Sequence, residues 1–422
     1  MEPAKKAVLA WSLYDFANSA YASVIPVLLF PLYYKTVILS NHPKVDLFWG
    51  LVSGGSIVLS GLCSPFLGIL ADLLKKRRFF FILTSLIAIL GTASLAFSGS
   101  LSPLVATLIF ILTNLSFNLA LNFYDALLGS VSNKETSGKI SSLGYALGYG
   151  GGIIATLLVY PFLKQGVDAP WFWLSFVIVA VFYVLFALPS FFFVKEREVE
   201  HFEKVVHPFK TGLRHIFSVF KEWRSHKQIW LFLLASYFLT EGIVTLSFFI
   251  ALYTQTTLHL SGAQIAIFAI FIQVVAVPAT LIFGRFTGNG KYRTVLIGSI
   301  FGLLLTTLLL GLATNLFVLY LAGFVGGLVI GSSQAIARAW YTHMVPAEKR
   351  AMFFGFNTFA SKISTTIGPP VFGLISVMTG SQRLAIFFVG IYFIISLVLF
   401  LNVKESLCGP VKESAHPSSQ KH

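Results

Sequence analysis

Charged side chains are rare inside the long apolar stretches of this 422-residue chain. A charge at the centre of a membrane helix costs roughly 2.5 to 3.5 kcal/mol on insertion scales, so such a group normally faces a cavity or a partner. Groups of this kind can bind protons or a charged ligand. We therefore expect a proton or substrate pathway along these residues and their polar neighbours: Tyr14, Asp15, Asn18, Asp125, Glu241, Gln334 and Lys362.

The clearest pattern lies in the first apolar stretch, where Asp15, Asn18, Ser19 and Ala22 recur at helical spacing and would share one face. A polar, small-residue face on an otherwise apolar helix should turn toward water rather than lipid. Our hypothesis is that Asp15 couples to protons or binds a substrate amine, with Asn18 as its hydrogen-bond partner. The alternative is an aspartate that only ties helices together.

Glu241 and Lys362 should lie at similar depth near the middle of their stretches. They could form a permanent ion pair, whose loss would be costly, or a pair that substrate or a proton exchanges. Asp125 lies near the cytosolic end of its stretch. Arg338 also falls near the cytosolic interface, where we expect a gate or a topology anchor.

Twelve apolar stretches, six on each side of a charged segment, should position these residues. A bilayer core of roughly 30 Å requires about 20 residues of helix, and 56% of the chain is hydrophobic while only 11% is charged. Continuous apolar runs favour helices over barrel strands. The stretches are Val8–Ile38, Leu47–Leu74, Phe79–Ser98, Pro103–Val131, Ile140–Leu163, Pro170–Val194, Ile229–Gln255, Gly262–Phe286, Tyr292–Ala313, Leu316–Thr342, Ala351–Thr379 and Leu384–Val403.

Basic residues predict the orientation of these helices. If the spans alternate and the first tail is cytosolic, only Lys35, Lys44, Lys164 and Arg383 fall outside the membrane on the outer side. This positive-inside bias places both termini in the cytosol, so the net charge of +14 is a topology signal rather than a nucleic-acid signature. We expect lobes at 1–194 and 229–404, a linker with a basic amphipathic helix at 195–228, and a disordered tail at 405–422. The linker is a tether or a regulatory site.

The two halves also resemble each other. Gly68-Ile-Leu-Ala-Asp72, followed by a basic run that includes Arg77, matches Gly284-Arg-Phe-Thr-Gly288 in the second half. Lys139-Ile-Ser-Ser-Leu-Gly144 likewise matches Arg350-Ala-Met-Phe-Phe-Gly355. Glycines recur every four residues at 144–152 and 323–331, which favours close helix packing or helices that slide. We expect Gly68, Asp72, Arg77, Arg338 and Arg350 to act in gating.

Parallel repeats of six helices are typical of the major facilitator superfamily, and the turn at Gly68–Asp72 resembles that superfamily's loop signature. The run Trp11-Ser-Leu-Tyr14-Asp15-Phe-Ala-Asn18-Ser19 resembles, more narrowly, the opening of its vacuole-effluxer-like (autophagy-related) branch. Gly331-Ser-Ser-Gln334-Ala-Ile-Ala-Arg338 fits the same branch. The resemblance covers nearly the whole chain and implies transport of amino acids or related small polar metabolites.

We therefore expect an all-α membrane protein of twelve helices in two six-helix lobes, working as a secondary transporter by alternating access and coupled to protons. The alternatives are a gradient-driven drug or peptide effluxer and a non-transporting receptor. We expect neither an enzyme, a cofactor nor a metal, because nucleophile, metal and nucleotide motifs are missing from the sequence. Expected partners are a small substrate, a coupling ion and lipid, but not nucleic acid; the expected state is a monomer in the cell (inner) membrane.

Overall fold

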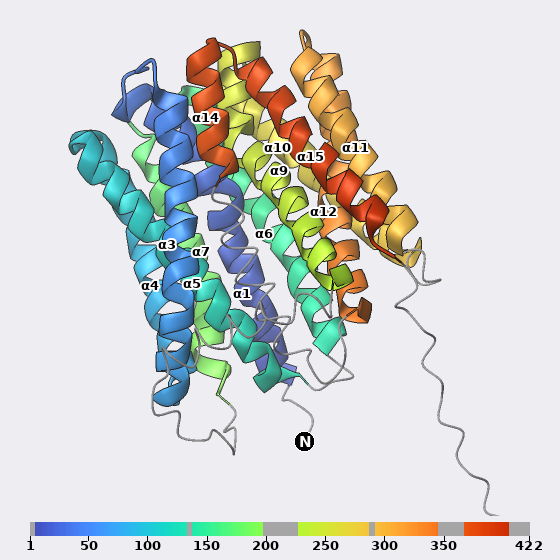
Figure 1. The fold of residues 1–422 in the computed structure, drawn as a ribbon. Helices are drawn as coiled ribbons and strands as arrows, with labels where there is room; N and C mark the ends of the chain where they lie inside the picture. The colour runs from blue at the N-terminus through green and yellow to red at the C-terminus, as the bar shows by residue number, and fades with distance from the viewer. Residues whose placement is uncertain (1–4, 133–136, 197–226, 287–291, 345–366, 405–422) are drawn as a thin grey trace, which may run out of the picture.

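The computed structural model describes residues 5–132, 137–196, 227–286, 292–344 and 367–404, and every regular element in these ranges is helical (Figure 1). A helix satisfies its own backbone hydrogen bonds, which lipid cannot do. The all-α fold predicted from the sequence is thus confirmed. The main helices are α1 (Lys5–Val24), α3 (Val45–Leu73), α4 (Arg77–Ser94), α5 (Pro103–Val131), α6 (Ser137–Gln165), α7 (Trp173–Phe193), α9 (Lys227–Leu258), α10 (Gly262–Phe286), α11 (Tyr292–Leu312), α12 (Leu316–Met344), α14 (Gly368–Thr379) and α15 (Gln382–Asn402).

Eleven spans in the described ranges are long and apolar enough to cross a bilayer. The remaining predicted stretch, 351–379, is represented only by the twelve residues of α14, because 351–366 lie outside the described residues. The multi-pass character of the chain is clear from these helices. The count of twelve spans and the cytosolic placement of both termini stay predictions.

The first span changes its helix type around two prolines. After α1, the chain continues without a break through a wide π-helical turn at Ile25–Leu29, a short α2 (Phe30–Tyr33) and a second wide turn at Tyr34–Ile38. Pro26 and Pro31 have no backbone N–H to donate, and a wider turn accommodates the missing bonds. The predicted first stretch is therefore helical throughout, but beyond Val24 it alternates between π-helical turns and the short α2.

The helices pack as two groups that follow the chain (Figure 1). In the first group, α1 packs on α6 and α7, and α4 packs on α5; in the second, α9 packs on α15, and α12 packs on both α10 and α11. The groups touch each other mainly through α3 with α14 and α6 with α10. The predicted boundaries of the lobes stay predictions, and most of the linker and tail lies outside the described residues.

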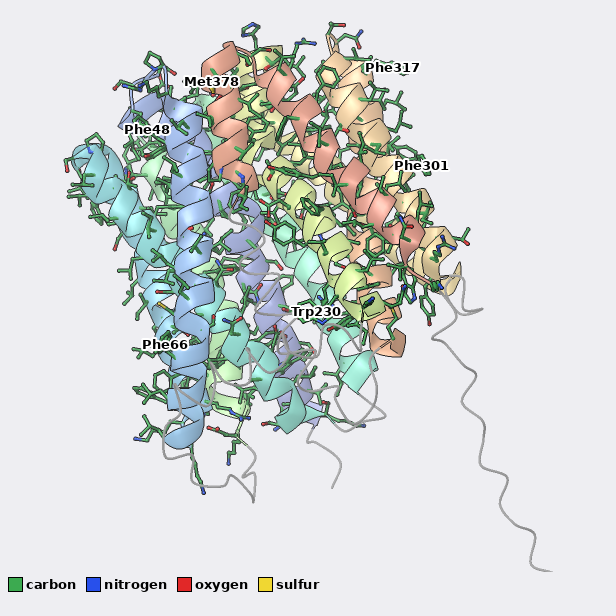
Figure 2. All side chains as sticks on the ribbon, viewed as in Figure 1. Phe48, Phe66, Trp230, Phe301, Phe317 and Met378 are labelled. Atoms are coloured by element: carbon green, nitrogen blue, oxygen red, sulfur yellow. The ribbon has the colours of Figure 1, made fainter. Side chains whose placement is uncertain are left out.

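Large apolar side chains project from the outside of the bundle. Phe66, Phe301, Phe317 and Met378 are all more than half exposed and point away from the helices (Figure 2). In water such a surface would drive aggregation. In a bilayer these side chains face acyl chains, which agrees with the hydropathy of the spans.

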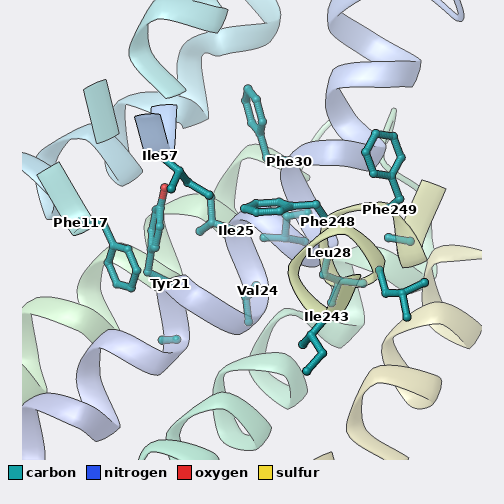
Figure 3. Close-up of a cluster of buried hydrophobic side chains, with 14 of the residues drawn as sticks. Tyr21, Val24, Ile25, Leu28, Phe30, Ile57, Phe117, Ile243, Phe248 and Phe249 are labelled. Carbon is teal, nitrogen blue, oxygen red and sulfur yellow. The ribbon is translucent and has the colours of Figure 1, made fainter. Parts of the chain in front are cut away.

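The buried core is continuous between the two groups. Tyr21 and Val24 of α1 and Phe117 of α5 lie in the same cluster as Phe248 and Phe249 of α9 (Figure 3). Because lipid tails are as apolar as these side chains, tight packing rather than exclusion from water must hold the helices together.

Candidate functional site

A cavity of about 360 Å³ lies between the two helix groups. Below, the end of the bundle where α1 begins is called the inner end, following the charge-based prediction, and the opposite end is called the outer end. Ligand pockets usually span about 300 to 1,000 Å³, so this central cavity suits a compact ligand. The first group contributes Ala22, Ser23, Val27, Leu28 and Tyr149, and the second contributes residues of α9, α10, α11 and α12.

Polar side chains from both groups converge on the central cavity. Ser23 and Tyr149 come from the first group, whereas Gln273 comes from α10. A Cβ atom placed on Gly152 would lie 2.5 Å from Gln273 Oε1 and 2.7 Å from Ser23 Oγ, so only glycine leaves room for both side chains. On the opposite side, a Cβ on Gly331 would lie 2.7 Å from the Tyr149 hydroxyl.

The rest of the lining is mainly apolar, with Ser247 and Thr306 as further hydroxyl groups. Among the described residues that line this cavity, none is charged. The predicted pathway residues in the described ranges lie elsewhere. Asp15, for example, is eight residues toward the inner end from Ser23, which is about 12 Å along α1.

Asp15 is held inside the first group by two hydrogen bonds. The Tyr124 hydroxyl donates to Asp15 Oδ2 at 2.9 Å, and the Asn18 amide donates to Oδ1 at 3.3 Å. Tyr124 also stacks on Trp11 with ring centroids 4.3 Å apart, and the Trp11 indole donates to the Tyr124 carbonyl. The predicted contact between Asp15 and Asn18 is confirmed, and Tyr124 ties α5 to the same carboxylate.

Glycines of α6 allow α1 to come close at this point. A Cβ on Gly144 would collide with Asp15 Oδ2, and one on Gly148 would lie 2.9 Å from Ser19 Oγ. Gly151 packs directly on the Phe16 carbonyl. The close approach predicted from the four-residue spacing is confirmed, while sliding of the two helices stays a prediction.

Tyr14 points into the first group. Its side chain is fully buried, and its hydroxyl is 2.7 Å from Ser85 Oγ and 2.8 Å from the Tyr183 hydroxyl. These contacts join α1 to α4 and α7. Tyr14 therefore supports the helix that carries Asp15 and does not line the central cavity.

Glu241 is fully buried in the second group. Its Oε1 atom accepts a hydrogen bond from the backbone N–H of Gly368, at the start of α14, while Oε2 has no hydrogen-bond partner among the described residues. A negative charge at a helix N-terminus is favoured by the helix dipole. Lys362, the predicted ion-pair partner of Glu241, lies outside the described residues.

Gln334 and Arg338 line a second cavity of about 240 Å³ between α9 and α12, here called the inner cavity. Tyr237 and Thr240 of α9 face the same space. Both predicted residues are exposed, and they lie toward the inner end of α12. The inner cavity is therefore separate in its lining from the central one.

The predicted gating loop lies at the inner end between α3 and α4. Gly68 and Arg77 line a cavity of about 230 Å³ with Asn122 of α5. The Glu196 carboxylate accepts hydrogen bonds from the backbone N–H groups of Arg77 and Arg78, at 3.2 and 3.3 Å, and so caps α4. This cap ties the loop to the end of α7.

Three other predicted residues, Asp125, Asp72 and Arg350, are not among the described residues that line the cavities above. Asp125 is exposed next to Tyr124 on α5. Asp72 lies in the last turn of α3, where only the backbone is described. Arg350 lies outside the described residues.

A buried carboxylate at the outer end joins the two groups. Asp46, in the first turn of α3, accepts hydrogen bonds on Oδ2 from Ser376 Oγ of α14 at 2.6 Å and from Gln382 Nε2 of α15 at 2.7 Å. Nearby, the Trp49 indole donates to the Phe248 carbonyl at 2.9 Å, and Lys35 donates to Thr256 at 2.7 Å. The outer end is thus closed in this structure.

Sequence reasoning missed Tyr124, Gln273, Tyr149 and Asp46. Asp46 falls one residue before the second predicted stretch, and the other three are uncharged polar residues inside apolar helices. Only the glycines at 144–152 and 323–331 hinted that polar groups would face them. A search for polar residues opposite glycine stripes could have found Tyr149 and Gln273.

The comparisons with known proteins agree with this architecture. Residues 129–407 match the family model described as "Vacuole effluxer Atg22 like". An uncharacterised MFS-type transporter, YxiO of Bacillus subtilis, is 28% identical over 96% of both chains. Autophagy-related protein 22 of Yarrowia lipolytica is 25% identical over 64% of this chain and 51% of its own length, so the match spans about half of that fungal relative.

Solved structures show the same fold at low sequence identity. The D-xylose-proton symporter superposes with a TM-score of 0.74 at 13% identity, covering 94% of this chain and 96% of its own. The nucleoside transporter NupG superposes with a TM-score of 0.69 at 15% identity, covering 95% and 100%. Fold and relatives are those of transporters rather than enzymes. The chain belongs to the vacuole effluxer Atg22-like family and has the fold of the major facilitator superfamily.

Proposed function

We propose that this secondary transporter moves a small polar metabolite, in the first instance an amino acid with an apolar side chain, through the central cavity by alternating access. The observation that carries the proposal is the cavity of about 360 Å³ lined by both helix groups. Rocking of two repeats around a site at their interface would expose such a cavity to each side in turn.

The lining supports this substrate class. Amide and hydroxyl groups of Gln273, Ser23 and Tyr149 offer hydrogen bonds at one side, and apolar side chains of α9 and α10 offer a surface for an aliphatic group. A compact substrate fits the volume better than a peptide.

We also propose proton coupling and location in the cell membrane. Two buried or half-buried carboxylates, Asp15 and Glu241, lie in different helix groups, and carboxylates inside the membrane commonly mark ion pathways. The mapping of the basic residues to the inner end supports a plasma-membrane topology with cytosolic termini. The D-xylose-proton symporter, as its name states, couples the same fold to protons.

Uptake by the purified protein in liposomes tests the proposal. We expect an imposed pH gradient to drive accumulation of aliphatic amino acids over sugars, nucleosides and dipeptides. Gln273→Leu should raise the KM about fivefold to thirtyfold, because one buried hydrogen bond to the substrate is worth about 1 to 2 kcal/mol. Gly298→Ala, where an added Cβ meets nothing within 4 Å, is the matched control.

Two results would contradict the proposal. Selective uptake of large apolar drugs, with no response to amino acids, would replace the substrate class with that of a drug effluxer. Unchanged kinetics in Gln273→Leu would show that substrate does not use the central cavity.

A further inference from the structure

Two buried carboxylates hold opposite ends of the short helix α14. Glu241 of the second group accepts from the backbone N–H of Gly368 at the first residue of α14, and Asp46 of the first group accepts from Ser376 near its last turn. Ser376 follows Gly368 by eight residues, which is about 12 Å along the helix. One short helix therefore connects a carboxylate inside the second group with the closure of the outer end.

The contact at Glu241 is tight and incomplete. A Cβ on Gly368 would collide with Thr245 Oγ1, so α14 begins pressed against α9. Glu241 Oε1 accepts a hydrogen bond from Gly368, and the Ile367 backbone also lies close to the carboxylate. By hydrogen-bond geometry, Oε2 is buried without a partner among the described residues. Because a buried polar atom without a partner is unfavourable, this oxygen is well placed to take up a proton.

The contact at the outer end is equally specific, although Asp46 Oδ1 is also buried without a hydrogen-bond partner among the described residues. Gly373 packs against the Asp46 carbonyl, and Gly50 of α3 packs against the backbone of Pro369. Movement of α14 by a fraction of a helical turn would break both the Ser376 hydrogen bond and this glycine packing. The position of α14 thus controls the part of the outer closure that Asp46 and Ser376 form.

We propose that Glu241 binds the coupling proton and that α14 transmits its protonation state to the outer closure formed by Asp46, Ser376 and Gln382. The proposal rests on the proton coupling put forward above and assigns it to one residue and one helix. Protonation converts a charge-assisted hydrogen bond into a weaker neutral one. It also removes the attraction between the carboxylate and the N-terminus of α14.

In this proposal the proton reaches Glu241 from the inner cavity, which its neighbours on α9 line. Tyr237, one helical turn before Glu241 on α9, lines that cavity together with Thr240, Gln334 and Arg338. Among the described residues, Tyr237 of α9 and Tyr392 of α15 are titratable groups within electrostatic range of Glu241. Lys362 precedes α14 by a few residues and lies outside those ranges, so it is included in the test.

Asp15 is less suited to this role. Both of its oxygens already accept hydrogen bonds, from Tyr124 and Asn18, and both donors belong to the first group. It touches α6 rather than α14. Asp15 is therefore not placed to act on α14 directly.

The test measures the distance between spin labels at Phe48→Cys on α3 and Thr379→Cys on α14, both exposed at the outer end, in a chain with Cys63→Ser and Cys408→Ser. In lipid nanodiscs, we expect mildly acidic pH to lengthen this distance in the otherwise native chain. Glu241→Gln should show the longer distance at both acidic and alkaline pH, and Glu241→Asp should restore a pH response. The exposed-site control Asp168→Asn should respond like the parent.

A second arm examines the ends of the helix separately. Asp46→Asn should lengthen the distance at both pH values, because the closure is weakened directly. Lys362→Gln should keep a pH response. A response that disappears in Lys362→Gln but persists in Glu241→Gln would assign the switch to the lysine and overturn the proposal, as would a parent chain whose distance ignores pH.

Transport assays separate this inference from the proposed function. With a transported substrate in hand, Glu241→Gln should lose accumulation driven by a pH gradient while retaining exchange of labelled for unlabelled substrate. Loss of both activities in a folded variant, or retention of both, would contradict the inference. If the parent transports no compound tested, the proposed substrate fails, yet the spin-label distances still decide the role of Glu241.

Discussion

At the scale of single residues, Tyr124 makes several contacts with α1. Its hydroxyl donates to Asp15 Oδ2 at 2.9 Å and also lies 3.1 Å from the Trp11 carbonyl, while its ring stacks on the Trp11 indole. One side chain of α5 therefore fixes both the conformation of Asp15 and the position of α1. Asp15 should act only in the geometry that Tyr124 imposes.

Tyr124→Phe tests this role. Removing the hydroxyl leaves Asp15 with only the Asn18 amide, and the loss of a hydrogen bond to a charged group costs about 1.5 to 3 kcal/mol. We expect a lower midpoint of thermal unfolding in detergent and slower transport. Tyr160→Phe, on α6 and away from Asp15, is the control. Wild-type stability and rate in Tyr124→Phe would show that the hydroxyl is dispensable.

Local residue patterns could be predicted, whereas contacts between distant residues could not. The hydrogen bond between Asn18 and Asp15 follows from helical spacing alone. Tyr124 is 109 residues from Asp15, and nothing in its own neighbourhood distinguishes it from other aromatic residues of the spans. Charge drew attention to Asp125, although its uncharged neighbour makes the contact. The roles of the predicted pathway residues stay predictions.

At the scale of helices, α1 and α6 meet along glycines because polar atoms occupy the space that side chains would need. Gly144 faces Asp15, Gly148 faces Ser19 and Gly152 faces Ser23, at intervals of one helical turn. This row of contacts at Gly144, Gly148 and Gly152, here called the glycine seam, leads from Asp15 to the central cavity. Any side chain added to α6 there should separate the two helices.

Gly144→Ala tests the glycine seam. Its new Cβ would collide with Asp15 Oδ2, and overpacking of this kind costs about 1 to 3 kcal/mol. Gly55→Ala is the matched control, because a Cβ there meets nothing within 4 Å and alanine favours helix over glycine by up to about 1 kcal/mol. The midpoint temperature of thermal unfolding should be lower in Gly144→Ala than in the parent. It should be unchanged or higher in Gly55→Ala. A Gly144→Ala variant with the parent's stability and activity would show that α1 and α6 can accommodate the added methyl group.

Helix positions were predictable because the hydrophobic length needed to cross a bilayer is fixed. Irregular turns inside a span were harder to predict. The wide turns around Pro26 and Pro31 lie inside what the sequence presents as one uninterrupted stretch. The short α14 likewise gains its importance from contacts at its two ends, with Glu241 and Asp46, that hydropathy does not reveal.

At the scale of the whole molecule, the two helix groups meet tightly at the outer end and enclose the central cavity nearer the middle. The Asp46, Trp49 and Lys35 hydrogen bonds all cross between the groups at that outer end. A transporter must break such contacts once in each cycle. Repeated sequence motifs predicted the two-group architecture, but which end is closed depends on contacts between residues hundreds of positions apart.

The most direct test of the central claim is the reactivity of Ser23→Cys from each side of the membrane. In a chain with Cys63→Ser and Cys408→Ser, a membrane-impermeant thiol reagent is applied to right-side-out and to inverted vesicles. The account predicts modification from both sides, slowed in both cases by the transported substrate, because Ser23 lines a cavity that opens alternately. Modification from one side only, under all substrate and pH conditions, would contradict it.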